Sequence, residues 1–276
     1  MTAAPRSVGA VILDWAGTMI DHGSRAPAGA FVRAFATFGV AITEAQARGP
    51  MGRAKRDHIR AVAALPDVAA AWRARHGREP DEADGDAILA AFEPMTVAAA
   101  ADHTALIPGA LATVEALRAR GVRIGSTTGY TRPIMQVVLP LAAAAGYAPE
   151  VTVCAGDLAE GRPSPLMMWY AMARLGVWPA DRVVKVDDTP IGLAEGGAAG
   201  TWTVGVALTG NIAALSAEEL ATLTPEARAA LRARAMVELH AAGADLVIDS
   251  VAALPDAVAE IDRRLVAGAR PRGAGG

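Results

Sequence analysis

Short apolar runs alternate with longer amphipathic segments along most of this chain, beginning near the N-terminus and resuming after residue 108. The amphipathic segments, such as Ala110–Arg120 and Pro165–Leu175, carry apolar residues at helical spacing. Buried strands that alternate with helices are typical of a parallel sheet covered on both faces. The pattern predicts an α/β fold with a doubly wound parallel sheet, a Rossmann-like core. The expected strands are Val8–Leu13, Val122–Ser126, Val151–Val153, Val183–Val186, Thr201–Val206 and Leu246–Ile248.

The alternation stops within residues 26–102. From Thr43 onward this region is rich in alanine and charged residues and has no convincing strand. Three prolines are expected to divide it into short helices: Pro66, Pro80 and Pro94. We therefore predict a small α-helical cap domain at 26–102, inserted into a catalytic core made of residues 1–25 and 103–267. The tail 268–276, with its glycines, arginines and a proline, is expected to be disordered.

Composition narrows the class of protein. Hydrophobic residues make up 53% of the 276 residues but aromatic ones only 4%, which suits helices packed on a parallel sheet. A net charge of -3 offers no general attraction to nucleic acid, and no apolar stretch is long enough to predict a membrane span. The start of the chain does not have the pattern of a signal peptide. The single cysteine, Cys154, excludes an intrachain disulfide and favours the cytoplasm.

Polar side chains follow three of the predicted strands. Asp14 comes after the first, a loop from Thr127 to Tyr130 after the second, and Asp187 and Asp188 after a later one. Because the carboxyl ends of parallel strands meet at one edge of the sheet, these groups are expected to converge. An aspartate nucleophile, a hydroxyl and a further carboxylate suit magnesium-assisted attack on a phosphoryl group.

Ala16 is the unusual residue of the stretch Asp14-Trp-Ala-Gly-Thr18. Enzymes that attack phosphorus with such an aspartate usually carry a second acid two residues later, which protonates the leaving oxygen. Alanine cannot donate a proton. Either the site is inactive, or its leaving group needs another kind of assistance.

On these residues the chain resembles the haloacid dehalogenase superfamily and, within it, the phosphonatase family. The resemblance covers roughly Val8 to Ala267, and Ala16 together with the second stretch below narrows it. The matching stretches are Asp14-Trp-Ala-Gly-Thr18, Pro50-Met-Gly-Arg-Ala-Lys-Arg-Asp-His58, Gly125-Ser-Thr-Thr-Gly-Tyr-Thr-Arg132, Gly161-Arg-Pro163 and Lys185-Val-Asp-Asp-Thr189.

The resemblance implies hydrolysis of the carbon–phosphorus bond of phosphonoacetaldehyde, in the degradation of an aminoethylphosphonate. Lys55 of the cap would condense with the aldehyde to a protonated imine, a Schiff base that acts as an electron sink. Asp14 would take the phosphoryl group as an aspartyl phosphate. Since Lys55 must be neutral to attack, we expect its pKa to be lowered by desolvation or by the neighbouring cations Arg53 and Arg56.

The resemblance also implies the remaining site residues. Mg²⁺ would bind Asp14, the backbone carbonyl of Ala16, and Asp188. Thr128 and Arg162 would contact the phosphonate, while Met51 and His58 would line the cap side of the site. His58 is a candidate for proton transfer through water during imine formation.

Two positions depart from the family pattern. Ser24 stands where a relative carries a cysteine, and serine is expected to hydrogen-bond in a similar way. Gly192 replaces the second acid of the last motif, four residues after Asp188. We therefore expect Asp187 to support the metal site, and the direct ligand of the pair stays open.

Two alternative functions and a homodimer are also considered for this chain. A phosphatase or phosphomutase of the same superfamily is the first alternative, although Ala16 leaves it without a general acid. A non-catalytic phosphate-binding relative is the second. The resemblance also implies a homodimer formed through the cap. The helix Asp67–Arg75, with Val68 and Trp72 one turn apart on the same face, could supply its surface.

Overall fold

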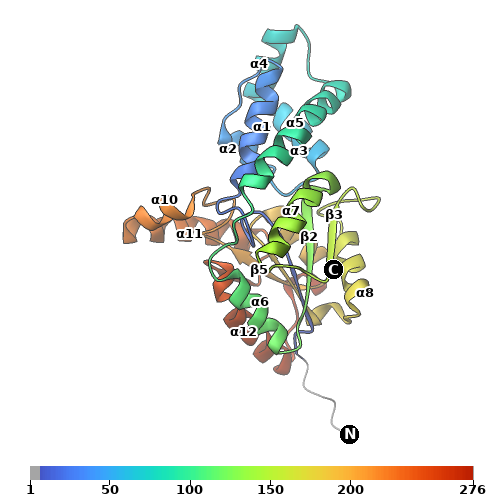
Figure 1. Ribbon diagram of the computed structural model, residues 1–276, viewed down its shortest axis with the longest axis vertical. Helices are drawn as coiled ribbons and strands as arrows, with labels where there is room; N and C mark the ends of the chain where they lie inside the picture. The colour runs from blue at the N-terminus through green and yellow to red at the C-terminus, as the bar shows by residue number, and fades with distance from the viewer. Residues whose placement is uncertain (1–6, 276) are drawn as a thin grey trace.

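A six-stranded parallel sheet forms the centre of the computed structural model, which describes residues 7–275 (Figure 1). The strand order is β3-β2-β1-β4-β5-β6, and every neighbouring pair is parallel. This confirms the predicted doubly wound sheet. Residues 1–6 of the predicted core and Gly276 of the predicted tail lie outside the described residues. The strands are β1 (Ala10–Leu13), β2 (Arg123–Thr131), β3 (Val151–Ala155), β4 (Val183–Asp187), β5 (Trp202–Val206) and β6 (Leu246–Ile248).

Helices cover both faces of the sheet because its strands are apolar on both sides. In β1, Val11 and Leu13 belong to a cluster with α6, α7 and α12, whereas Ala10 and Ile12 pack with α8. Helices α9, α10 and α11 contribute to a further cluster. These helices are α6 (Ala110–Ala119), α7 (Arg132–Ala144), α8 (Leu166–Leu175), α9 (Pro190–Ala198), α10 (Ala217–Thr222), α11 (Pro225–Ala241) and α12 (Leu254–Val266).

Strand β1 is the point where the strand order reverses. β2 and β3 lie on one side of it, and β4, β5 and β6 on the other. Leu13, the last residue of β1, is level with Ser126 of β2 and Val186 of β4. In open α/β sheets a crevice forms outside the carboxyl ends of the strands at such a reversal. The residues that follow these three positions therefore share one edge of the sheet.

Five helices between β1 and α6 form a separate unit beside this edge (Figure 1). Their apolar side chains pack on one another in a cluster of their own, which contains Phe31, Ile59 and Phe92. Among the helices that the structure describes, none has both the length and the apolar character needed to cross a membrane. The helices of the unit are α1 (Arg25–Thr37), α2 (Glu44–Arg48), α3 (Lys55–Ala63), α4 (Pro66–His76) and α5 (Glu82–Asp102).

Pro94 does not end a helix, contrary to the expectation. It lies inside α5, which runs on to Asp102, whereas Pro66 occupies the first turn of α4. An internal proline removes one helical hydrogen bond, and packing of the helix can compensate for that loss. Phe92 and Thr96, on either side of Pro94, are fully buried, so α5 is held by its contacts.

Val68 and Trp72 do not form an external face, which corrects the expected dimer surface. Their exposures are 1% and 0%, and both belong to the apolar cluster of the five-helix unit. Trp72 also lies near the ring of Phe38, at a centroid distance of 6.0 Å. Two apolar residues one turn apart mark a buried helix face as readily as an interface, and here the unit itself covers them.

Two further segments differ from the expectations. Residues 127–130, expected to form a loop, continue β2, whose register against β3 shifts between Thr128 and Thr131. The tail is ordered through 275, since Arg272–Gly275 forms a 3-10 helix and the Arg272 N–H donates to the Asp245 carboxylate at 3.0 Å. The amino-acid composition of the tail predicted disorder because composition carries no information about contacts between the tail and the core.

Replacing Trp72 by alanine should lower the free energy of unfolding by about 3–5 kcal/mol, because it empties a site at the centre of the five-helix unit. The matched control is Trp178→Ala, since Trp178 is 80% exposed. Urea denaturation of both variants checks this. Equal losses in the two variants would contradict the assignment of Trp72 to the core.

Candidate active site

Three buried carboxylates meet at the carboxyl ends of β1 and β4. Asp14 directly follows β1, Asp187 ends β4 and Asp188 comes next in the chain. Each can place one oxygen within 4.8 Å of the others. The Asp14 N–H donates to the Val186 carbonyl at 3.0 Å, which fixes Asp14 beside β4. The sheet thus brings together residues more than 170 positions apart in the sequence.

The electrostatics of this acid cluster suit a divalent cation. Burial, then the nearby Asp187, raises the pKa of Asp14 to about 6. Burial, then Asp14 and Asp187, raises the pKa of Asp188 well above its usual range. Mg²⁺ prefers oxygen ligands such as carboxylates. A divalent cation between these three carboxylates would also relieve the repulsion between their negative charges. The residues present therefore fit a metal ion.

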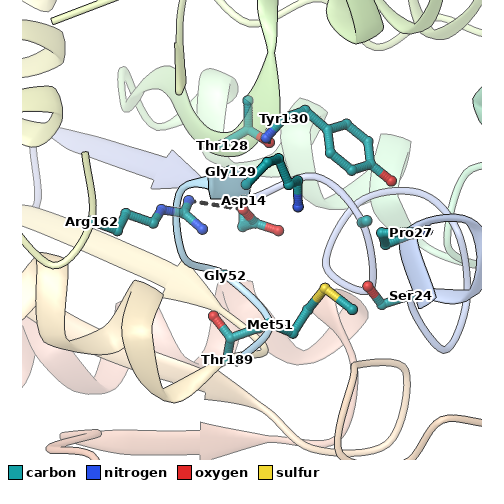
Figure 2. A pocket seen from close by; sticks show the side chains of 12 residues that line it. Asp14, Ser24, Pro27, Met51, Gly52, Thr128, Gly129, Tyr130, Arg162 and Thr189 are labelled. Atoms are coloured by element: carbon teal, nitrogen blue, oxygen red, sulfur yellow. Dashed lines mark hydrogen bonds and ion pairs between the residues drawn. The ribbon is translucent and has the colours of Figure 1, made fainter. Parts of the chain in front are cut away.

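Arg162 forms ion pairs with two of these acids, Asp14 and Asp187. One of its Nη atoms donates to Asp14 Oδ1 at 2.8 Å (Figure 2). The same atom donates to the Thr127 carbonyl at 2.7 Å. Its Nε donates to Glu195 Oε2 at 3.0 Å. The Arg162 side chain is 2% exposed, so the guanidinium is oriented by these acceptors rather than by water.

Lys185 and Glu195, which were not among the predicted site residues, complete the charge network. Lys185 Nζ donates to Thr127 Oγ1 at 2.7 Å and lies 3.1 Å from Asp187 and 3.2 Å from Glu195. Thr127 Oγ1 also donates to Glu195 Oε2 at 2.8 Å. Lys185 could have been predicted from the sequence, because a lysine within an apolar strand is buried and needs a charged or polar partner. Nothing in the sequence around Glu195, in α9, indicates that it is buried in the site.

Gly192 explains the position of Asp187. A Cβ atom at residue 192 would lie 1.9 Å from Asp187 Oδ2 and 2.0 Å from Asp187 Cγ. The Asp187 carboxylate therefore occupies the space that a side chain at 192 would need. Its Oδ1 also accepts hydrogen bonds from the Thr189 N–H at 3.0 Å and the Thr189 hydroxyl at 2.7 Å.

A small cavity of about 30 Å³ lies between the acids and the five-helix unit. That is room for about two or three water molecules, so the unit is closed over the site. Ala16 is part of the wall, where it supplies no acid. Figure 2 shows Met51, Ser24 and Pro27 across the cavity from Thr128 and Arg162. The lining residues are Asp14, Ala16, Ser24, Pro27, Met51, Gly52, Lys55, Thr128, Gly129, Tyr130, Arg162 and Thr189.

Lys55 reaches this cavity as the first residue of α3, although it is distant from Asp14 in the sequence. Its Nζ lies over three aromatic rings, at 5.5 Å from Phe31, 5.9 Å from Phe92 and 5.6 Å from Tyr130. Burial lowers the pKa of Lys55 to about 8, while Asp14 opposes the shift. Apolar surroundings disfavour the charged ammonium, so a larger fraction of the amine is neutral near pH 8.

The cation that assists this shift is not one of those expected. Arg162, in the core, lowers the Lys55 pKa after burial has done so. Arg56 is exposed and its Nε donates to Asp86 at 2.7 Å. Arg53 is exposed as well. The sequence neighbours of Lys55 therefore differ from its neighbours in space.

His58 lies one turn after Lys55 on α3 and does not line the cavity, unlike the expectation. Its Nε2 is 2.7 Å from the Ala47 carbonyl, which can only accept, so this nitrogen carries the proton. The ring stacks on Phe31 at 3.8 Å, and burial, then Lys55, lowers the His58 pKa to about 3. His58 is thus a neutral ring within the five-helix unit.

The family model for haloacid dehalogenase-like hydrolases matches residues 8–200. The phosphonoacetaldehyde hydrolase of Paraburkholderia xenovorans is 51% identical over 266 residues, covering 96% of this chain and 100% of that protein. That of Nitratidesulfovibrio vulgaris is 45% identical over 264 residues, covering 96% and 94%.

Solved structures agree with the fold. A phosphonoacetaldehyde hydrolase-like protein from Oleispira antarctica matches with a TM-score of 0.95 and 39% identity, over 98% of this chain and 100% of that one. A putative phosphoglycolate phosphatase from Lactobacillus delbrueckii matches with a TM-score of 0.64 and 19% identity, over 91% and 98%. At that identity the second likeness concerns the fold alone.

Gly192→Ala should weaken Mg²⁺ binding by about tenfold or more, because the new methyl group would displace the Asp187 carboxylate. Gly197→Ala is the control: it lies in the same helix, and a Cβ there meets nothing within 4 Å. Isothermal titration with Mg²⁺ measures both. Unchanged affinity in Gly192→Ala would show that Asp187 does not support the metal site.

Proposed function

This chain belongs to the haloacid dehalogenase-like hydrolases and, within them, to the phosphonoacetaldehyde hydrolase family; we propose that it hydrolyses the carbon–phosphorus bond of phosphonoacetaldehyde to acetaldehyde and phosphate. One observation carries the proposal. Lys55 and Asp14, from different structural units, line the same small cavity, and Ala16 stands in its wall where a general acid would serve a phosphate ester. An amine and a carboxylate facing one space suit an aldehyde joined to a phosphonate.

The first half of the reaction takes place at Lys55. Its neutral amine adds to the aldehyde carbon, and loss of water leaves a protonated imine. Burial against Phe31 and Phe92 supports this role, because it favours the neutral amine before the reaction. His58 has no charge to contribute at neutral pH, and any proton it exchanges would pass through the Nδ1 atom, which has no protein partner.

The second half takes place at Asp14. Its carboxylate attacks phosphorus, the carbon–phosphorus bond breaks, and the electron pair moves into the imine to give an enamine. Water hydrolyses the aspartyl phosphate, while protonation and hydrolysis of the enamine release acetaldehyde and free Lys55. The sum is one water consumed for one acetaldehyde and one phosphate formed.

The core residues bind the phosphonate and a metal in this proposal. Arg162 and Thr128 contact the phosphonate oxygens, since both line the cavity beside Asp14. Asp14, Asp188 and the backbone carbonyl of Ala16 would hold Mg²⁺, with Asp187 in support. When bound, the metal offsets the repulsion between the carboxylates and the phosphonate anion. Met51 and Ser24 shape the opposite wall.

Cellular context and assembly are part of the proposal. The reaction belongs to the degradation of an aminoethylphosphonate and is placed in the cytoplasm, which the single, buried Cys154 supports. A homodimer through the cap remains proposed, on surfaces other than Val68 and Trp72. A phosphatase or phosphomutase is disfavoured because Ala16 supplies no proton.

Two variants should separate the two halves of the reaction in a borohydride trapping experiment. Incubation with phosphonoacetaldehyde and borohydride should leave an ethyl group on Lys55 in the wild-type protein. In Asp14→Asn the adduct should retain the phosphonate, because the imine forms but the carbon–phosphorus bond stays intact. Peptide mass spectrometry distinguishes the two masses.

Lys55→Arg is the control for the trapping experiment, and it should give no adduct and no phosphate while Mg²⁺ affinity stays unchanged. Phosphate release by Lys55→Arg would falsify the imine mechanism. If the wild type releases phosphate from a panel of phosphate esters but not from phosphonoacetaldehyde, the phosphatase alternative replaces the proposal.

The rate of reductive trapping at Lys55 should rise with pH and level off above about 8. The attacking species is the neutral amine, and the lowered pKa places its formation near pH 8 rather than 10.5. Since Asp14 raises that pKa, the midpoint should move to lower pH in Asp14→Asn. Cyanoborohydride trapping at several pH values measures both midpoints, and a wild-type midpoint near 10.5 would mean that Lys55 is hydrated.

A further inference from the structure

Few polar contacts join the five-helix unit, α1–α5, to the core. Among the described residues, side chains of two residue pairs join the unit to the part of the core beyond residue 102 by hydrogen bonds. Arg25 donates to Glu219 at 3.3 Å, and both are exposed. The other pair, Arg48 and Asn211, is buried.

Arg48 and Asn211 bond to each other in both directions. Arg48 Nη1 donates to Asn211 Oδ1 at 3.2 Å, and Asn211 Nδ2 donates to the Arg48 carbonyl at 3.3 Å. The same Nη1 donates to the carbonyls of Gly23 at 2.8 Å and Ser24 at 3.3 Å. Arg48 is 9% exposed, and its carboxylate partner, Glu44, lies 3.6 Å away on the outside.

The carbonyls that Arg48 binds belong to the segment that leads from the core into α1. Three residues of this segment have left-handed backbone angles, with φ of 53° at Asp21, 83° at Gly23 and 50° at Ser24. Such angles are uncommon outside glycine and persist only where surrounding contacts hold them. Arg48 thus stabilises the connection about which the five-helix unit would turn.

Asn211 also contacts the acid cluster. Its backbone N–H donates to Asp188 Oδ2 at 2.7 Å, and the Thr18 hydroxyl donates to Asp188 Oδ1 at 3.2 Å. Arg48 therefore lies one residue away from a carboxylate of the proposed metal site. The path runs through directly bonded groups, from guanidinium to amide to carboxylate.

We propose that Arg48 and Asn211 form a latch that holds the five-helix unit closed over the cavity and fixes the loop that positions Asp188. Both are positioning residues. The inference rests on the proposed function in one respect: the cavity is too small to admit a substrate unless the unit opens. An arginine suits a reversible contact, because water solvates its charge when the latch is broken and polar acceptors offset its burial when it is closed.

Hydrogen exchange tests the latch without measuring activity. The segment between α2 and α3 lies against the core at Met51 and Gly52, which are buried, and Gly52 packs near Thr189. Its exchangeable amides are those of Gly49, Met51, Gly52 and Arg53, since Pro50 has none. With Mg²⁺ and inorganic phosphate present, Arg48→Met and Asn211→Ala should each exchange these amides about tenfold faster than wild type. The double variant should exchange more slowly than the product of the two single effects predicts, because both single variants remove the bond from Arg48 Nη1 to Asn211 Oδ1.

Two controls make the outcome specific. Arg25→Gln removes the exposed contact between the same units and should exchange as wild type. Arg48→Lys keeps the charge but has fewer donors, so its exchange should be intermediate. Wild-type exchange in Asn211→Ala, or an equal increase in Arg25→Gln, would overturn the latch. Because no step of the test involves phosphonoacetaldehyde, failure of the proposed function would leave this result readable.

Discussion

The rest of the structure depends on the need to hold four carboxylates together out of water. Asp14, Asp187, Asp188 and Glu195 are buried around two core cations, Arg162 and Lys185, which leaves a formal charge of -2. Buried charges persist only when partners fix their geometry. The strand ends supply that rigidity, and the excess charge is the complement of one divalent cation. The sheet reversal at β1 thus determines where the chemistry can occur.

The five-helix unit meets the opposite requirement. An amine nucleophile needs to lose its proton, and charged neighbours of opposite sign would prevent that. Lys55 is surrounded by Phe31, Phe92 and Tyr130, and the charge of Arg162 further lowers its pKa. The core therefore stabilises the charges of the carboxylates, and the five-helix unit shields the Lys55 amine from water. Because Lys55 is on a separate unit, most of its surroundings are apolar although it faces the same cavity as Asp14.

What the sequence could predict follows from this division. Apolar runs reveal strands, and polar residues at their ends reveal the edge where Asp14 and Asp188 meet. Pairings across the fold are not visible in a sequence, so Glu195 in α9 was missed and Arg162 was not expected beside Lys55. The same limit explains Trp72: helical spacing predicts that a face is covered, but not whether its own unit or another molecule covers it. Pro94 shows that packing can override a local preference.

Ala16 shows how the charge constraint and the chemistry agree. A general acid at this position would add another carboxyl group beside a cluster that already raises the pKa values of Asp14 and Asp188. It would have to be paired or protonated, and it would compete with a dianionic substrate for the same positive groups. A leaving carbon that delivers its electrons to an imine needs no proton at this point. With Lys55 as the electron sink on the facing unit, alanine satisfies the electrostatics of the core and leaves the cavity open.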